Sequence, residues 1–575
     1  MDRPPSRGAA TSIPSVLMSK RVYLETFGCQ MNELDSELVA GQLRSLGYRF
    51  VDAAAGADVV LYNTCSVREH AEQKVWSRLG ELVERKVSDP GLVVGVLGCM
   101  AERDGVDLIR RMPVVDLLCG PGELDKLPSL IDNAVRTRTS LIADENLEDG
   151  KAARTSAKSV ALQGNSSRRS ATLAAAEDSL ELLDLSRSVS PLDDDSAVKR
   201  SAYVRITRGC NKFCTYCVVP FTRGAEVHRP PDHIVEECRK LGAAGVAEIT
   251  LLGQTVNHYR FEHGSAVTVN GYVQPQKGRS YTGGHRRDPF AGERVTTFAD
   301  LLLRIHEEVP EIKRLRFVTS YPRDFGDDVL EVIRASPRIC RYLHVPAQTG
   351  SNRLLKMMNR GYEVEEYLEF LARCRQYLDQ PEIGRPLTLS GDFIVGFPTE
   401  TDEDFEASKR LLVAAQYKNA FIFKYSPRPG TIAFDKIPDD VPEAVKRSRN
   451  AELLSLQDSI GHTIGLQQVG RRFEVFIEGY SRKSLKKSGM TSGRLKSAGA
   501  VAITIGGRDL GEAGLSAAVV DDAEIVQLAG RTEGDLIVFI ETEAARAASL
   551  IGRIVPVHID SSDRLSLHGT LVSDR

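Results

Sequence analysis

The sequence predicts a multidomain α/β protein with a doubly wound parallel sheet, a partial (βα)6 barrel and a small all-β barrel, in that order. Three observations support this fold class. The chain has 575 residues, which is more than one domain usually holds. Apolar runs alternate with amphipathic stretches over residues 20–136 and 196–466, and short β-type runs without helices fill residues 467–575.

Residues 20–136 form the first predicted domain. Three apolar runs are each followed by a helical stretch, namely residues 33–46, 69–85 and 102–111, and a fourth apolar run closes the region. Such strand–helix repetition predicts parallel strands with helices on both faces. The four apolar runs are VYLETFG, DVVLYNTC, LVVGVLGC and VVDLLCG.

Residues 137–195 interrupt this pattern. They contain no aromatic residue and are rich in Ala, Ser, Arg and Asp, which is typical of a chain that cannot bury a core. We predict a flexible linker with one loose helix near residues 173–185. The alternative is a helical cap.

Residues 196–466 return to strand–helix alternation with six predicted strands. Six units predict a partial barrel rather than a complete barrel of eight. A Gly-rich polar insertion at about residues 261–294 is expected to be a surface excursion. The predicted strands are AYVRIT, EITLLGQ, RLRFVTS, YLHVPAQ, LSGDFIVGF and AFIFKYS.

Residues 467–575 contain the β-type runs RRFEVFIEG, VAITIGG, DLIVFIETE and RIVPVHID, which predict a small β-barrel. A basic run at its start is a candidate RNA contact. An ordinary solvated charge run is the alternative, and charge alone does not separate the two. The run holds Arg471, Arg472, Arg482, Lys483, Lys486, Lys487, Arg494 and Lys496 against Glu474 and Glu478.

Net charge and hydrophobic patterning limit the class of protein. The net charge of −3 gives no overall basic field, so any nucleic-acid contact must be local. Residues 1–20 lack a continuous apolar run, and the longest one, Leu92–Met100, has half the length of a membrane span. We therefore expect a cytoplasmic protein without membrane contact. In a reducing compartment its ten cysteines should not form disulfides, and clustered ones indicate metal or redox chemistry.

Cys210, Cys214 and Cys217 form the first cysteine set, with the spacing C-x3-C-x2-C directly after a predicted barrel strand. Thiolates are soft ligands, and three from one loop leave an iron of a cluster open to a small molecule. The carboxyl end of a barrel strand is where such folds place their sites. A zinc site is the alternative, and it would need a fourth ligand such as Cys238 or His228.

Cys29, Cys65 and Cys99 form the second set. Each ends an apolar strand, and the carboxyl ends of parallel strands meet at one edge of a sheet. We expect these three thiols to converge. The alternative is three packing cysteines, since Cys is often buried. Cys119 ends the fourth strand and could complete the set, whereas Cys238, Cys340 and Cys374 are interpreted as packing residues.

With Tyr216 at the aromatic position, the first set is similar to the signature of radical S-adenosylmethionine (SAM) enzymes. Both predicted catalytic domains together resemble the methylthiotransferases of that superfamily. NTCSVRE and CNKFCTYCVVPFTRG resemble most the branch that forms 2-methylthio-dimethylallyladenosine in tRNA. The last domain resembles the OB-like TRAM domain of this family, although an insertion at about residues 484–527 and the long linker depart from the pattern. Further motifs that carry the resemblance are ETFGCQMNELDS, LLGQTVNHY, HVPAQTGSNRLLKMMNRGY, DFIVGFPTETDEDF and YSPRPGT.

The resemblance implies two [4Fe–4S] clusters. One, on Cys210, Cys214 and Cys217, would bind SAM and generate a radical. The auxiliary cluster, on Cys29, Cys65 and Cys99, would supply or carry sulfur. Tyr216 would lie near the SAM adenine. The reaction would methylthiolate C2 of N(6)-dimethylallyladenosine at position 37, in the anticodon loop of tRNA. This C–H bond is unactivated, so a cofactor radical suits it.

Two residues at barrel strand ends are further candidates. Gln254, in LLGQ, and His344, in YLHVPAQ, could touch SAM or substrate, and we select Gln254 as a cofactor-binding residue. Expected partners, besides tRNA, are a flavodoxin- or ferredoxin-like electron donor and a sulfur source, and we expect a monomer.

Two alternative functions remain at this point. One is a sister methylthiotransferase that acts on threonylcarbamoyl-adenosine in tRNA or on a ribosomal protein aspartate. The other is a non-catalytic iron–sulfur RNA-binding sensor, which would need no open SAM site.

Overall fold

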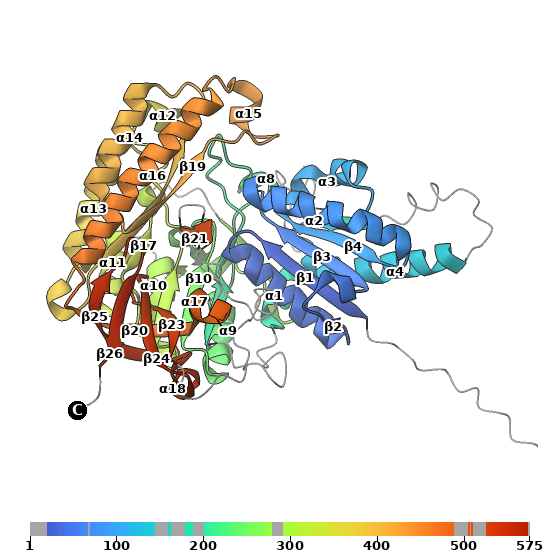
Figure 1. Ribbon diagram of the computed structural model, residues 1–575, viewed down its shortest axis with the longest axis horizontal. Helices are drawn as coiled ribbons and strands as arrows, with labels where there is room; N and C mark the ends of the chain where they lie inside the picture. The colour runs from blue at the N-terminus through green and yellow to red at the C-terminus, as the bar shows by residue number, and fades with distance from the viewer. Residues whose placement is uncertain are drawn as a thin grey trace, which may run out of the picture.

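The computed structural model describes residues 20–66, 69–143, 159–162, 179–187, 200–278, 291–487, 504–505, 508–509 and 525–572. In Figure 1 the N-terminal sheet domain lies at the right in blue, the central βα unit in green to orange, and the C-terminal β-barrel at the lower left in red. Among the described helices, none has both the length and the apolar composition that a membrane span requires.

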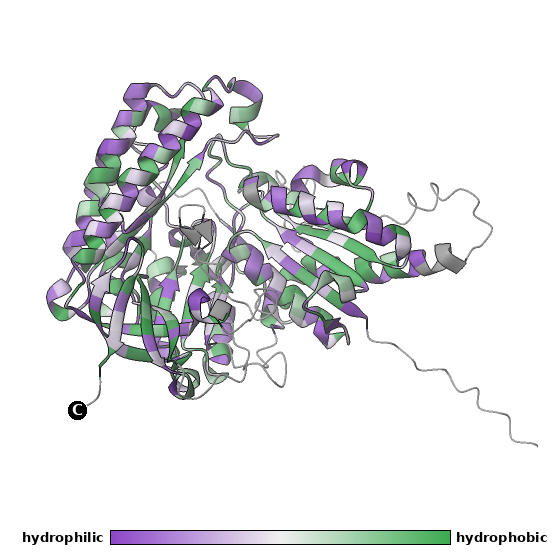
Figure 2. Cartoon of the chain, in the orientation of Figure 1, coloured by the Kyte–Doolittle hydropathy of each residue, from purple (hydrophilic) through white to green (hydrophobic). Residues whose placement is uncertain are grey.

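The N-terminal sheet has six parallel strands, which confirms the predicted parallel sheet. Every residue of β3 and β4 is buried, and these strands are largely apolar in Figure 2. In spatial order the strands are β2 (Arg49–Phe50), β1 (Arg21–Phe27), β3 (Val59–Thr64), β4 (Val93–Gly98), β5 (Leu117–Cys119) and β6 (Ser159–Ala161).

Helices cover both faces of this sheet, as a doubly wound fold requires. On one face α1 (Gln30–Ser45) and α4 (Leu127–Ala143) pack on strand residues such as Leu61 and Leu97. On the other face α2 (Glu69–Ser88) and α3 (Cys99–Arg111) pack on Val60 and Val96. Successive side chains of each strand point to opposite faces of the sheet, so each strand contributes residues to two separate cores.

Parts of the predicted linker belong to this domain. Helix α4 extends to Ala143, β6 adds the sixth strand, and α7 (Ser179–Leu185) lies within the range of the predicted loose helix. Leu180 and Leu183 of α7 join the core on the α1 side. The helix near 173–185 is therefore present as predicted, but it is packed rather than loose, and the prediction of a flexible linker is wrong for the end of α4 and for β6. The rest of 137–195 lies outside the described residues.

All six predicted barrel strands are present, in two parallel three-stranded sheets joined by an isolated parallel bridge between Leu315 and Ile339. The arrangement agrees with a partial barrel. The strands are β7 (Ser201–Arg205), β10 (Glu248–Leu252), β16 (Arg314–Phe317), β17 (Tyr342–His344), β18 (Thr388–Val395) and β19 (Asn419–Lys424).

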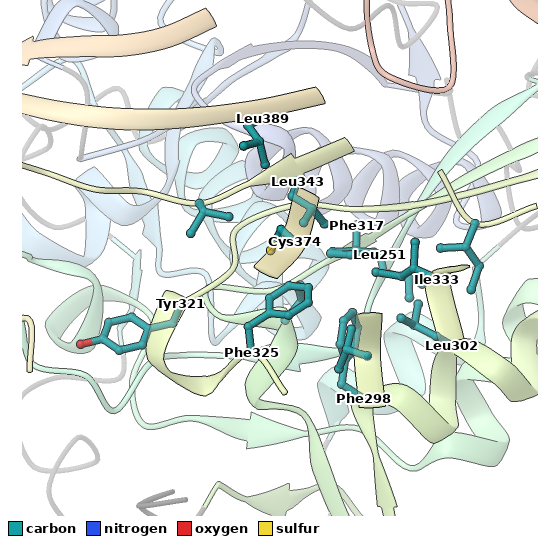
Figure 3. Close-up of a cluster of buried hydrophobic side chains, with 14 of the residues drawn as sticks. Leu251, Phe298, Leu302, Phe317, Tyr321, Phe325, Ile333, Leu343, Cys374 and Leu389 are labelled. Atoms are coloured by element: carbon teal, nitrogen blue, oxygen red, sulfur yellow. The ribbon is translucent and has the colours of Figure 1, made fainter. Parts of the chain in front are cut away.

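Helices outside these strands enclose one large apolar core. Figure 3 shows Leu251 and Phe317 of the strands near Phe298 and Leu302 of a covering helix, and Leu343 beside Cys374. The covering helices are α9 (Pro231–Ala243), α10 (Phe298–Glu308), α11 (Asp327–Ala335), α13 (Val364–Leu378), α14 (Asp402–Ala415) and α16 (Glu443–Leu466). Cys238 and Cys374 lie in this core and Cys340 is also buried, which confirms the three as packing residues.

The insertion near 261–294 is more than a surface excursion. Strand β11 (Arg260–Glu262) pairs with β15 (Val295–Thr297), and β12 (Thr268–Val269) pairs with β13 (Tyr272–Val273). Strand β14 (Gln276–Lys277) pairs with β9 (Val227–His228), which itself pairs with β8 (Thr207–Arg208). The insertion thereby reaches the segment that precedes the first cysteine set.

The C-terminal domain is a closed five-stranded barrel, as predicted. Its strands are β20 (Arg472–Tyr480), β23 (Ile525–Arg531), β24 (Ile537–Glu543), β26 (Leu567–Leu571) and β25 (Ile554–Ser562), and α18 (Ala544–Leu550) contributes Ala547 and Leu550 to its core. The prediction of VAITIGG as a barrel strand is wrong. Only Thr504–Ile505 of it is described, and it pairs with Arg508–Asp509, while β23 fills the barrel position.

This β-barrel docks on the amino-terminal ends of the βα strands. Arg314, the first residue of β16, donates to the carbonyl of Arg531 at 2.7 Å, and Lys418, just before β19, pairs with Asp535 at 2.5 Å. Thr388, the first residue of β18, donates to the carbonyl of Gly534 at 2.6 Å. The carboxyl ends of the strands therefore point away from this docking surface.

Candidate functional site: two cysteine sets

Cys29, Cys65 and Cys99 lie at the carboxyl edge of three adjacent strands, β1, β3 and β4. The amide of Cys65 donates to the carbonyl of Phe27 at 2.9 Å, which holds the first two strand ends together. A Cβ added to Gly28 would lie 2.8 Å from Cβ of Cys65, so glycine is required there. The structure brings the three strand ends together, as the sequence predicts.

Cys119 is placed differently. It pairs in register with Leu97, so its position on β5 lies two residues short of Cys99 at the sheet edge. Its thiol donates to the carbonyl of Glu123 at 3.2 Å and packs in the core beside Leu124. Cys119 is therefore a packing residue rather than a fourth member of the set.

A buried polar network supports the second cysteine set. Asn32 donates through Nδ2 to Oδ1 of Asn63 at 3.0 Å, and Asn63 donates to the Asn32 carbonyl and to Ser36, both at 2.9 Å. The Cys29 thiol contacts Oδ1 of Asn32 at 3.4 Å. Gly98 has φ +86°, and a Cβ there would lie 2.4 Å from Oδ1 of Asn63. These amides fix the backbone beneath the thiols.

Cys210, Cys214 and Cys217 occupy one tight loop after β8. The amide of Cys217 donates to the Cys214 carbonyl at 3.0 Å, and the amide of Cys210 donates to the Gly224 carbonyl at 3.2 Å. Gly209, at φ +67°, allows the chain to pass the Ala225 carbonyl, which a Cβ would approach to 2.1 Å. The loop thus curls so that its three thiols lie within electrostatic reach of one another.

Burial and neighbouring charges both act on the thiols of this loop. Burial raises the pKa of Cys210 to about 12, with Glu226 adding to the shift, and burial together with Cys214 raises the pKa of Cys217. Arg360 donates from Nη1 to Sγ of Cys214 at 3.4 Å. Buried thiols of this kind ionise when a metal centre stabilises the thiolates, so three soft donors here fit iron.

A single-metal site does not fit this geometry. Within the described ranges, no three His, Cys, Asp or Glu side chains are grouped closely enough to hold one metal ion. Cys238 lies in the barrel core and His228 faces Glu226 at 3.5 Å. A zinc site with either residue as fourth ligand is therefore not supported.

The other candidate residues lie near the first set. Tyr216 packs against a small apolar cluster that includes Leu354, Phe397 and Tyr425. Gln254 is half-buried on the loop after β10, next to Thr255, whose hydroxyl is 3.9 Å from Sγ of Cys210. Sequence reasoning missed Thr255 and Arg360, although both occur in the motifs LLGQTVNHY and NRGY.

Further polar and aromatic groups share one face of β17, β18 and β19, the face opposite the apolar core. His344 contacts Oγ of Ser390 at 2.7 Å and Oδ2 of Asp392 at 3.3 Å. The rings of Phe421 and Phe423 stack with centroids 6.5 Å apart and planes at 12°. Phe423 is 37% exposed. This face therefore offers both an apolar platform and hydrogen-bonding groups.

Buried ion pairs fasten the N-terminal domain to the barrel. Asp35 on α1 accepts from Arg205 at 3.1 Å and from Arg223 at 2.8 Å. Arg205 also pairs with Asp184 of α7 at 2.7 Å. A second connection joins Glu72 of α2 to Arg428 at 2.8 Å. These ion pairs therefore fix the position of the second cysteine set, in the N-terminal domain, relative to the first cysteine set, in the barrel.

Comparisons with known proteins place these features in a family. The model of "Uncharacterized protein family UPF0004" matches residues 21–120, and the model of the Radical SAM superfamily matches residues 204–412. A protein of Rhodopirellula baltica named tRNA-2-methylthio-N(6)-dimethylallyladenosine synthase is 38% identical over 554 residues, 96% of each chain. The chain belongs to this family. Synthases of the same name from Porphyromonas gingivalis and Dichelobacter nodosus are each 36% identical, over 83% and 96% of this chain and 88% and 96% of their own.

Membership of this radical SAM family has two consequences. The family uses SAM and [4Fe–4S] clusters as cofactors, and the protein is an enzyme.

Solved structures with partial likeness include the radical SAM methyltransferase TsrM from Kitasatospora setae, with 14% identity, a TM-score of 0.42, and coverage of 72% of this chain and 77% of that one. The cobalamin-dependent radical enzyme OxsB has 12% identity, a TM-score of 0.39, and coverage of 77% and 57%.

The predicted RNA-contacting run is only partly described. Arg472 is exposed, and the side chain of Lys483 is 75% exposed, at 4.0 Å from Glu541. Arg471 donates to the side chain of Gln468 at 3.3 Å. The side chains of Lys486, Lys487, Arg494 and Lys496 lie outside the described residues.

Proposed function

We propose that this protein methylthiolates C2 of N(6)-dimethylallyladenosine at position 37 of tRNA, giving 2-methylthio-N(6)-dimethylallyladenosine. The observation that carries the proposal is the pair of three-cysteine sets, one at the carboxyl ends of three parallel strands and the other in the loop that follows β7 and β8. The relatives named for this reaction support it, since they align over up to 96% of the chain.

Each cysteine set would hold a cluster with a different role. Cys210, Cys214 and Cys217 would hold the cluster that binds SAM, and Cys29, Cys65 and Cys99 would hold the auxiliary cluster. A SAM-bound [4Fe–4S] cluster supplies an organic radical that can take hydrogen from an unactivated C–H bond. Tyr216 and Gln254 would contact SAM, and Thr255 and Arg360 would orient Cys210 and Cys214.

The substrate base would enter the polar and aromatic face of β17–β19. A base in a single-stranded loop can be splayed out and stacked on aromatic rings. Phe421 and Phe423 offer such a platform, and His344 with Asp392 offers hydrogen-bonding groups. Burial of the five-carbon dimethylallyl group would contribute a few kcal/mol, at about 0.8 kcal/mol per CH2 unit. That binding energy would orient C2 toward the radical.

We assign residues 20–136 to the auxiliary-cluster domain, 196–466 to the radical SAM core and 467–575 to a TRAM domain that holds the anticodon loop. A flavodoxin- or ferredoxin-like protein would supply electrons, and a separate sulfur source would restore the auxiliary cluster. We place the reaction in the cytoplasm, with a monomeric enzyme. All ten cysteines fall among the described residues and none forms a disulfide, which suits a reducing compartment.

The test compares three tRNAs that differ only at position 37: unmodified, isopentenylated and threonylcarbamoylated. Reconstituted enzyme, SAM, sulfide and reductant are supplied to each. Methylthiolation chiefly of the isopentenylated tRNA is the expected result. Faster reaction on the threonylcarbamoylated tRNA would move the protein to the sister subfamily, and absence of 5′-deoxyadenosine in every reaction would favour a non-catalytic sensor.

A further inference from the structure

One short segment links the two cysteine sets. It leaves the first set at Cys217, forms α8 (Val219–Thr222), and returns at Gly224, whose carbonyl accepts from the amide of Cys210 at 3.2 Å. Helix α8 packs on α3, which begins at Cys99 of the second set (Figure 1). A residue on this segment therefore belongs to one cysteine loop and touches the surroundings of the other.

Arg223 is that residue. Its side chain is only 5% exposed, and its Nη2 donates to Oδ2 of Asp35 at 2.8 Å. Asp35 lies on α1, the helix whose N-cap is Cys29. The opposite oxygen of Asp35 already accepts from Arg205 at 3.1 Å. One carboxylate therefore serves two buried guanidinium groups, and Arg223 is held against the N-terminal domain.

The same segment also touches the second set directly. Thr222, the residue before Arg223, forms a side-chain hydrogen bond with Cys99. Together with the packing of α8 on α3 and the pairing of Arg223 with Asp35, this contact places Arg223 beside the helix ends that carry Cys99 and Cys29.

We propose that Arg223 is a positioning residue for the auxiliary cluster: a buried guanidinium that the SAM-cluster loop presents to the sulfurs held by Cys99 and Cys29, and that raises the reduction potential of that cluster. The inference rests on the proposed function in assuming a cluster on Cys29, Cys65 and Cys99. A buried cation favours the more negative, reduced form, and neighbouring charges and hydrogen bonds are what a protein uses to set such potentials.

The location of Arg223 has a consequence for the enzyme as a whole. Because the residue lies six positions after Cys217, a shift of the SAM-cluster loop would move the guanidinium relative to the auxiliary cluster. Arg223 therefore links the electronic state of the sulfur-bearing site to the conformation of the radical-generating site.

The experiment isolates the auxiliary cluster. The parent is the full-length chain with Cys210, Cys214 and Cys217 replaced by Ala, so that only the auxiliary cluster can form. The parent and its Arg223→Gln and Arg223→Lys variants are reconstituted anaerobically. The iron content and the midpoint potential of each are then measured. The Gln variant should keep its iron, with the reduction equilibrium shifted at least tenfold toward the oxidised cluster, which is about 59 mV for a one-electron couple. The Lys variant should lie close to the parent.

Arg187→Gln is the matched control. Arg187 also joins α1 to the barrel, through Glu37 at 2.6 Å and Glu237 at 3.3 Å, and both partners are carboxylates. Its replacement should leave the potential unchanged. An unchanged potential in Arg223→Gln, or the same shift in Arg187→Gln, would overturn the proposal.

Loss of iron in Arg223→Gln is also decisive. If Arg223→Lys then keeps the iron, the positive charge is what the cluster needs, and the proposal stands. If the Lys variant loses iron equally, Arg223 has only a packing role and the proposal is wrong. A parent chain that holds no iron would instead contradict the assignment of Cys29, Cys65 and Cys99, which is a failure of the proposed function.

Discussion

Arg360 donates a hydrogen bond from Nη1 to Sγ of Cys214 at 3.4 Å, and through Nη2 it also donates to the carbonyl of Pro346 at 3.1 Å. The arginine therefore ties the first cysteine loop to the segment after β17. Its guanidinium also lies 4.7 Å from the ring centroid of Tyr321. A single buried cation thus positions the central thiol of the loop.

Replacement of Arg360 by Gln should weaken the SAM-binding cluster. A hydrogen bond to a charged group contributes about 1.5–3 kcal/mol, so cluster affinity should fall at least about tenfold. Iron content and 5′-deoxyadenosine formation measure the effect. Arg353→Gln is the control, since Arg353 is 46% exposed and pairs with Asp404. Full iron retention in Arg360→Gln would contradict the positioning role.

Replacement of Cys210, Cys214 and Cys217 by Ala should remove about half of roughly eight irons per chain and leave the spectrum of the other cluster intact. The physical reason is that the two sets lie on different domains, each with its own supporting contacts. Loss of all iron, or of none, would contradict two separate clusters.

Cys119→Ala should keep the full iron content. Its thiol contacts the carbonyl of Glu123 within the core, so the variant should lose only about 1 kcal/mol of unfolding free energy. Cys99→Ala is the paired variant and should lose the auxiliary cluster. Equal iron loss in both would return Cys119 to the ligand set.

Asp35→Asn should destabilise the contact between the N-terminal domain and the barrel. The change leaves Arg205 and Arg223 with one buried carboxylate fewer, and breaking such a pair costs about 3–5 kcal/mol. Thermal unfolding should show a lower Tm, or the separate melting of one domain. A Tm equal to that of the parent chain would show that these ion pairs do not hold the domains together.

Phe421→Ala combined with Phe423→Ala should lower kcat/KM for isopentenylated tRNA about tenfold, which is the loss of about 1.4 kcal/mol of stacking and burial. Cleavage of SAM without tRNA should be unchanged, because the two rings lie on the face of β17–β19 and not in the cysteine loop. Val413→Ala, at a 49% exposed position on α14, is the control. Unchanged kinetics with tRNA would remove this face from the substrate site.

Much of the fold follows from local patterns. The parallel sheet, the six barrel strands and the convergence of Cys29, Cys65 and Cys99 come from apolar runs and from the rule that parallel strands end at one edge. These features depend on the pattern of apolar and polar residues within a short stretch of chain, and this pattern can be read from a single sequence. The packing role of Cys238 and Cys374 followed in the same way.

The remaining features depend on contacts between distant residues. Asp35 and Arg223 are separated by 188 positions, and nothing in either local pattern indicates that they pair. VAITIGG has a stronger β pattern than IVQLAGR, yet β23 holds the barrel position because it pairs with β20 and β24. The helix predicted near 173–185 is present as α7, but its packing was not predicted, because two leucines and a carboxylate find partners on distant elements.

The most direct test of the central claim is mass spectrometry of tRNA nucleosides from cells with and without this protein. Cells that lack it should accumulate N(6)-dimethylallyladenosine and contain no 2-methylthio-N(6)-dimethylallyladenosine, and the intact gene, but not a Cys214→Ala version, should restore the methylthiolated nucleoside. Unchanged levels of 2-methylthio-N(6)-dimethylallyladenosine in cells without the protein would contradict the account.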